Sequence, residues 1–194
     1  MRIYFLMILS ILLNSCFKNS KVTETSEPIN TEIENRKQTN TIKDSVLIEN
    51  KVKHSFSQID KNDEFYICIK GKSIVEGKMI FKIIKSDGIV ILNEEFPSYL
   101  LIGYGFEGDK NSVKDKEDYI KSRISDFFNE DKFIQPAIQP GESFDEDYSD
   151  KEIWDDIKSD QTSIGFSYLI GEDDGRMISF SKKKGKVVMY FNCC

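Results

Sequence analysis

Hydrophobic and polar positions divide the chain into three consecutive regions. Residues 3–13 are apolar apart from one tyrosine and one serine. Residues 17–53 are mostly Thr, Glu, Asn, Lys and Ser, with isolated aliphatic residues that cannot form a core. From residue 54 onward, short apolar runs alternate with turn-forming residues. The pattern predicts a leader, a disordered tether and a single folded domain over 54–194.

Six runs rich in β-branched and aromatic residues predict strands in the folded region. Three of them precede a central region with helical periodicity, and three follow it. The runs cover residues 65–70, 78–84, 89–96, 162–170, 176–181 and 186–191. Asp87-Gly88, between the second and third runs, is a frequent hairpin turn. Each group of three is therefore expected to form an antiparallel meander.

Two helices are predicted between the strand groups. In the first, apolar residues recur every third or fourth position from Ile120 to Phe128, and Ser112 is the expected N-cap. Ser149 and Glu152 form a capping box for the second. Residues 133–141 contain two prolines and are expected to be an irregular loop. The order βββ-αα-βββ predicts an α+β fold with a mostly antiparallel sheet.

The N-terminal apolar run has the composition of a secretory signal peptide. Arg2 supplies the positive charge, and the run is shorter than the roughly 20 residues that a membrane-spanning helix needs. Leu13-Asn14-Ser15-Cys16 resembles the lipobox of bacterial lipoproteins, although Asn14 departs from the small residue usual there. The resemblance implies that residues 1–15 are removed. It also implies that Cys16 carries a thioether-linked diacylglycerol and an N-acyl chain such as palmitate.

Two or more acyl chains anchor a protein stably, so the expected location is the bacterial cell envelope, with the membrane as a partner. Residues 16–53 would then be a tether that holds the domain away from the lipid surface. The full chain has 27 basic and 33 acidic residues, a net charge of −6, and no basic run with interleaved aromatic residues. This balance argues against nucleic acid as a partner and leaves a protein of the envelope as the expected one.

Three cysteines besides Cys16 are present, an odd number for an exported protein. Cys68 falls in a predicted strand, and Cys193 and Cys194 follow the last one. Cys68, Cys193 and Cys194 are candidate disulfide partners, and three reduced thiols are the alternative. The only histidine, His54, lies in the polar stretch before the first predicted strand. We therefore expect no metal site of the zinc type.

Two further motifs match the residue spacing of known binding patterns but lack other features that those patterns require. Gly103-Tyr104-Gly105-Phe106-Glu107-Gly108 fits GxGxxG, but no helix begins within it and its acidic residues would repel phosphate. The acidic segment 142–150 spaces oxygen donors as a calcium loop does, but Asp150 stands where the loop requires glycine. We expect a flexible glycine loop and an acidic helix start, with no nucleotide, calcium or other cofactor.

Three functions remain open at this point. A lone histidine outside the expected core gives poor support to a Ser-His or Cys-His catalytic pair. The leading hypothesis is a membrane-anchored, non-enzymatic binding module. One alternative is an immunity or inhibitor lipoprotein that neutralises a toxin or hydrolase. The other is an acid-dependent hydrolase that uses adjacent carboxylates; the candidates are Glu94–Glu95, Asp155–Asp156 and Asp173–Asp174.

Overall fold

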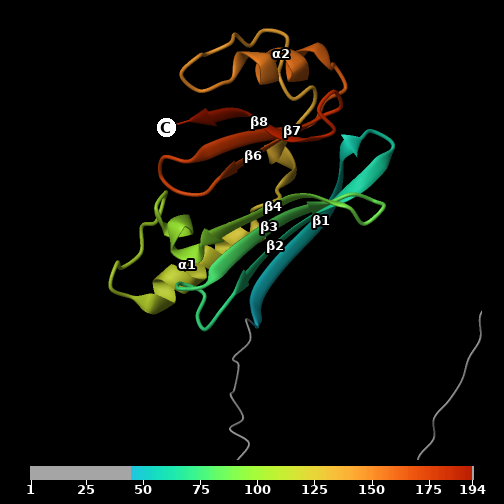
Figure 1. Cartoon of the computed structure of the whole chain (residues 1–194). Helices are drawn as coiled ribbons and strands as arrows, with labels where there is room; N and C mark the ends of the chain where they lie inside the picture. Colours follow the sequence, from blue (N-terminus) through green and yellow to red (C-terminus); the bar gives the residue numbers. More distant parts are fainter. Residues whose placement is uncertain (1–44, 194) are drawn as a thin grey trace, which may run out of the picture. The chain divides into compact units, whose positions relative to one another are not determined.

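The computed structural model describes residues 45–193 as an α+β domain (Figure 1). It contains two four-stranded antiparallel sheets and two α-helices, as the sequence predicts for the fold class. The signal peptide, Cys16 and most of the tether lie outside the described residues, and so does Cys194.

The first sheet is a meander of four strands in sequence order. The strands are β1 (Val46–Gln58), β2 (Lys61–Lys70), β3 (Lys78–Ile84) and β4 (Val90–Pro97). The last three match predicted strands, whereas β1 includes residues that the sequence places in the tether. Along β1, Glu49, Lys51 and Lys53 are exposed and alternate with half-buried residues. A strand with one charged, solvated face has too few apolar residues to be read from hydrophobicity alone.

The second sheet is also antiparallel, in the order β5-β6-β7-β8. Its strands are β5 (Phe133–Ile134), β6 (Gly165–Leu169), β7 (Gly175–Ser181) and β8 (Lys186–Cys193). The two residues of β5 belong to the segment predicted to be an irregular loop. Because β5 is so short, β6 has a sheet partner on that side only at Gly165 and Phe166.

Both α-helices lie between the strand groups in sequence. In α1 (Val113–Ser125), the Ser112 side chain accepts a hydrogen bond from the Asp115 backbone N–H, as predicted. Helix α2 (Lys151–Ser159) begins one residue later than predicted. Its N-cap is Asp150, which accepts from the Ile153 N–H at 3.0 Å, so the prediction of Ser149 as the cap is wrong. A carboxylate at this position also interacts favourably with the positive end of the helix.

A cluster of aromatic rings joins the two sheets and α1. Phe166 of β6 is fully buried at its centre, with six other ring centroids at 4.8–6.2 Å. These rings come from β2, β3, β5, β6 and the turn after α1: Phe65, Phe81, Phe133, Tyr168, Phe127 and Phe128. The core is therefore continuous between the first sheet and the inner face of the second.

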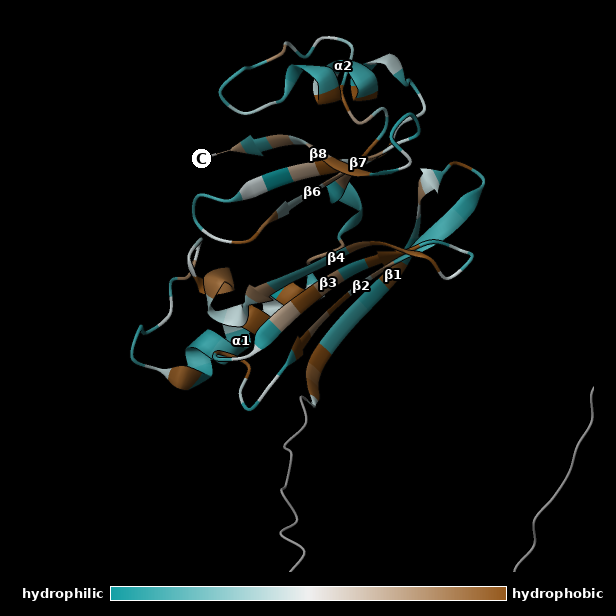
Figure 2. Cartoon of the chain, viewed as in Figure 1, coloured by the Kyte–Doolittle hydropathy of each residue, from teal (hydrophilic) through white to brown (hydrophobic). Residues whose placement is uncertain are grey.

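Helix α2 covers the other face of the second sheet. Trp154 and Ile157 of α2 pack with Val188 and Tyr190 of β8 in a smaller cluster. Figure 2 shows hydrophobic residues of α2 on the side turned toward the sheet and hydrophilic residues on the outer side. The domain is thus layered as first sheet, second sheet and α2, with α1 packed against the first sheet.

A polar network also ties the sheets together. Tyr168 of β6 donates to Glu94 of β4 at 2.8 Å. Arg176 of β7 forms two hydrogen bonds with Asp174, at 2.6 and 2.8 Å, and approaches Glu94 at 3.4 Å. These side chains are half-buried or buried, so the network fixes the position of β4 against β6 and β7.

Candidate functional site

A cleft of about 240 Å³ opens where β6 extends beyond β5 and faces the end of α1. We call it the cationic cleft because two arginines and one lysine line it. The residues that line it include Arg123, Lys132, Arg176, Met177, Phe191 and Cys193. They come from α1, from the 3₁₀ turn after it (Glu130–Lys132), and from β7 and β8.

The strand register explains the shape of the floor. Leu169, Gly175 and Cys193 are paired across β6, β7 and β8, so they point to the same face. Gly175 is the central member and has no side chain, and Cys193 and Leu169 fill the space beside it. A Cβ there would meet the Cys193 Sγ at 3.1 Å. The neighbouring row places Met177 beside Phe191 and gives the floor an apolar edge.

Arg123 lies in the wall of the cleft and bridges three segments through its guanidinium. One terminal nitrogen donates to the Leu101 carbonyl at 3.1 Å and the Tyr104 carbonyl at 3.3 Å. The other donates to the Leu169 carbonyl on β6 at 2.9 Å. Arg123 therefore ties the glycine loop and the end of the 3₁₀ segment Ser98–Ile102 to the edge of the second sheet.

Lys132 is the second cation in the wall. Its Nζ donates to the carbonyls of Asp126 and Phe127, at 2.7 and 3.3 Å, just beyond the end of α1. Its ammonium also lies 5.6 Å from the centre of the Phe127 ring. Burial lowers the pKa of Lys132, and the positive charge of Arg123 lowers it further, while Asp131 and Asp126 oppose the shift. The site thus disfavours the charge that Lys132 carries.

The third cation, Arg176, differs because acidic side chains neutralise it. Asp174 and Glu94 both form ion pairs with its guanidinium. Within residues 45–193, neither Arg123 nor Lys132 forms an ion pair with a carboxylate. Backbone carbonyls carry only partial charge, so the wall keeps two formal positive charges beside an apolar floor.

The structure brings only one of the candidate disulfide residues to the cleft. Cys193 ends β8 within the cleft, whereas Cys68 is fully buried in β2 of the first sheet and belongs to no disulfide. A bridge between Cys68 and Cys193 would need these residues on neighbouring strands, but they lie in different sheets. A bridge between Cys193 and Cys194 stays a prediction, because Cys194 lies outside the described residues.

The adjacent carboxylates bind separate partners. Glu94 accepts from Tyr168 within the polar network, whereas Glu95 pairs with Lys78 at 2.9 Å. Asp155 pairs with Lys151 at 2.5 Å, and Asp156 accepts from the Ser181 hydroxyl at 2.5 Å. Asp174 binds Arg176, and its neighbour Asp173 is exposed. The two carboxylates of each neighbouring pair therefore lie in different environments and do not share a partner.

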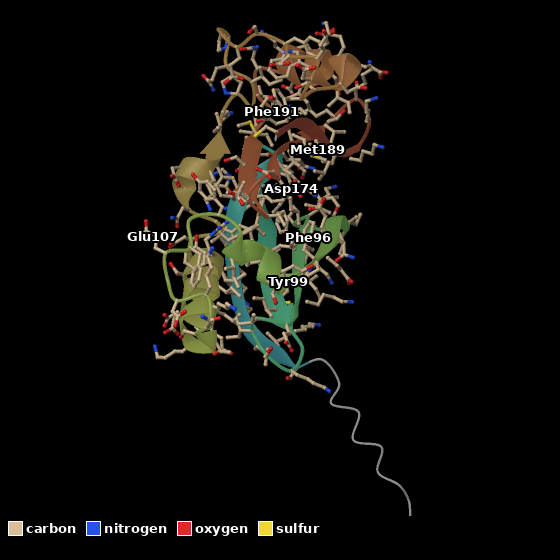
Figure 3. All side chains as sticks on the ribbon, turned by 90° about the vertical axis from the view of Figure 1, so that its left-hand side faces the viewer. Phe96, Tyr99, Glu107, Asp174, Met189 and Phe191 are labelled. Carbon is tan, nitrogen blue, oxygen red and sulfur yellow. The ribbon has the colours of Figure 1, made fainter. Side chains whose placement is uncertain are left out.

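The glycine loop lies beside a second, wider hollow of about 630 Å³. Tyr99, Phe106 and Glu107 line it, and Figure 3 shows Tyr99 and Glu107 in the lower part of the domain. Tyr99 is 56% exposed, which leaves most of its ring available for contact. Helix α1 begins only at Val113, so no helix starts inside the GxGxxG pattern.

His54 lies in β1 rather than in a polar segment before the fold. Its ring stacks on Phe133 with the centroids 3.9 Å apart, and its Nε2 is 3.3 Å from Glu130. In the described part of the chain, no three His, Cys, Asp or Glu side chains group closely enough to hold a metal ion. None of the helices between residues 45 and 193 is long and apolar enough to cross a membrane.

The chain folds as an α+β domain with a small cleft that two arginines and one lysine line. Comparison with family models, with curated proteins and with solved structures finds no match for this chain. Sequence reasoning missed Arg123 and Lys132 because neither belongs to a motif, and only the fold brings them to β6–β8.

Proposed function

We propose that this chain is a membrane-anchored lipoprotein of the bacterial envelope whose domain is a non-enzymatic binding module. The observation that carries the binding function is the cationic cleft, where Arg123 and Lys132 lack carboxylate partners in the described domain. A partly buried charge is stabilised when an oppositely charged group binds beside it. The anchor rests on the resemblance of Leu13-Asn14-Ser15-Cys16 to a lipobox.

The anchor is tested by Cys16→Ser. We expect this substitution to abolish palmitate labelling and to release the protein from the membrane fraction, because the acyl chains would have no attachment site. Cys193→Ser is the matched control and should keep both properties. Unchanged labelling of the Cys16→Ser chain would contradict the lipoprotein assignment.

The binding function is tested by affinity capture from an envelope extract with the full-length chain as bait. A retained ligand that is lost with Lys132→Gln would support binding at the cleft. The inhibitor or immunity alternative uses a protein contact instead, and the exposed ring of Tyr99 suits such a contact. A captured toxin or hydrolase that is lost with Tyr99→Ala but kept with Lys132→Gln would favour that alternative.

A further inference from the structure

No carboxylate of the described domain forms an ion pair with Arg123 or Lys132, the two cations of the cleft wall. A guanidinium has five N–H groups, and the three hydrogen bonds of Arg123 leave two of them over. Lys132 likewise uses two of the three N–H groups of its ammonium. Both side chains are half-buried, so water screens them less than it screens a surface lysine. The wall can therefore donate further hydrogen bonds to an anionic group.

The floor is suited to a different part of a ligand. Met177 and Phe191 lie side by side on paired strands, and both line the cleft. Figure 3 shows Phe191 and Asp174 in the upper part of the domain, on β8 and beside the start of β7. Both side chains are half-buried and pack against the α2 cluster, so an apolar group placed over this floor would bury only the part of their surface that is exposed.

The size of the cleft limits what fits. A volume of 240 Å³ corresponds to about eight water molecules at roughly 30 Å³ each. Pockets for drug-sized ligands occupy about 300–1,000 Å³, so a nucleotide or an oligosaccharide would be too large to enter completely. A compact molecule, with one charged group and a body the size of a single ring, matches the space.

From this geometry we infer that the cationic cleft binds a small organic anion, a carboxylate or phosphate group carried on a compact apolar body. The anionic group lies against Arg123 and Lys132, where a planar guanidinium suits two-point contact with such oxygens. The apolar body lies on Met177 and Phe191. This inference rests on the proposed binding function and names its ligand class.

A purely structural role is the competing explanation for both cations. A lysine near the end of a helix commonly binds the last carbonyls, as Lys132 does, and Arg123 holds three segments together. A structural role predicts that removing the Lys132 charge changes stability alone. Ligand binding predicts that the same change weakens the affinity for anions and leaves the affinity for neutral analogues unaltered.

The inference is tested by isothermal titration calorimetry of the full-length chain in a non-ionic detergent. The probes are phenylacetate, phenyl phosphate, inorganic phosphate and the neutral analogue phenylacetamide. We expect saturable binding of at least one ring-bearing anion, with phenylacetamide weaker by about tenfold or more, because it lacks the charge. Comparing phenylacetate with phenyl phosphate distinguishes a carboxylate ligand from a phosphate ligand. Comparing phenyl phosphate with inorganic phosphate measures how much the apolar body contributes to the affinity.

Variants separate the cleft from the rest of the surface. Lys132→Gln should weaken anion binding by about tenfold, and Lys132→Arg should restore most of it. Lys61→Gln is the matched control, since this exposed lysine starts β2 and does not line the cleft. Circular dichroism verifies that each variant is folded.

Three results would overturn the inference. They are no anion binding tighter than about 1 mM, an affinity for phenylacetamide equal to that for the tightest ring-bearing anion, and a folded Lys132→Gln chain that binds anions like the wild type. If Lys132→Gln fails to fold, the comparison of anion and amide on the wild-type chain decides alone. Capture of an envelope partner in the absence of anion binding would contradict this inference and leave the proposed binding function standing.

Discussion

At the scale of single residues, two tyrosines show how burial controls ionisation. Tyr190 is 1% exposed between the second sheet and α2, and its hydroxyl donates to the Ala137 carbonyl at 2.9 Å. Burial raises the pKa of Tyr190 far above its ordinary value, and the charge of Glu142 adds to the effect. Burial raises the pKa of Tyr168 in the same way, with a further contribution from Glu94. Both hydroxyls therefore stay protonated in the folded domain.

We predict that the domain loses stability in alkali and that Tyr190→Phe reduces the loss. In the unfolded chain, tyrosine ionises near pH 10. The folded state then binds more protons than the unfolded state, so stability is complete below about pH 10 and falls as the pH rises. The slope is about 1.4 kcal/mol per pH unit for each such tyrosine. Urea unfolding at several pH values measures it.

Tyr99→Phe is the control for this experiment. Tyr99 is 56% exposed, whereas Tyr190 is buried, so Tyr99→Phe should leave the pH slope unchanged. Equal slopes for the wild type and Tyr190→Phe would show that Tyr190 ionises without unfolding the domain.

At the scale of elements, the start of α2 shows how closely a helix depends on one side chain. Asp150 caps the helix through the Ile153 N–H, whereas the hydroxyl of its neighbour Ser149 is buried without a hydrogen-bond partner in the described domain. The sequence pattern of serine followed three residues later by glutamate suggested the opposite assignment. A shift of one residue was enough to exchange the roles of the two side chains.

This exchange gives a direct prediction. Asp150→Ala should lower the free energy of unfolding by about 1 kcal/mol, because an N–H of the first turn loses its acceptor. Ser149→Ala should be neutral or slightly stabilising, because it removes a buried hydroxyl that has no partner. Urea unfolding of both variants measures the difference. A larger loss for Ser149→Ala than for Asp150→Ala would contradict the observed cap.

Local patterns predicted most elements and failed where tertiary contacts decide. The apolar runs located β2, β3, β4, β6, β7 and β8, because buried strands need β-branched and aromatic residues. Strand β1 was not predicted over its full length, because charged residues occupy one of its faces. Strand β5 was not predicted, because two residues are too few to show a periodic pattern. The cleft could not be predicted, since Arg123 and Lys132 meet β6 only through the packing of α1.

At the scale of the whole molecule, β1 determines where the folded domain begins. It pairs with β2 from Val46 onward, and the Asn50 side chain donates to the carbonyls of Ile124 and Ser125 at the end of α1. More than half of this strand lies before residue 54, the start expected from the sequence. The strand therefore connects the first sheet to α1, the helix that contributes Arg123 to the cationic cleft.

We predict that a chain beginning at residue 54 is much less stable than one beginning at residue 45. Its loss includes the ladder from Val46 to Lys53 and both Asn50 hydrogen bonds. At about 1 kcal/mol for each net hydrogen bond, the free energy of unfolding should fall by at least about 3 kcal/mol. Urea unfolding of the two chains provides the comparison. Equal stability would mean that residues 46–53 contribute nothing to the fold.

The charged positions of β1 also affect how copies of the domain meet one another. The first sheet ends at this strand, which presents Glu49, Lys51 and Lys53 to solvent. If a second copy paired with this edge strand, the ammonium groups of Lys51 and Lys53 would lose water and come close to the same charges of the other copy. Domains that share one membrane through the proposed acyl anchor can then lie next to one another without joining their first sheets edge to edge.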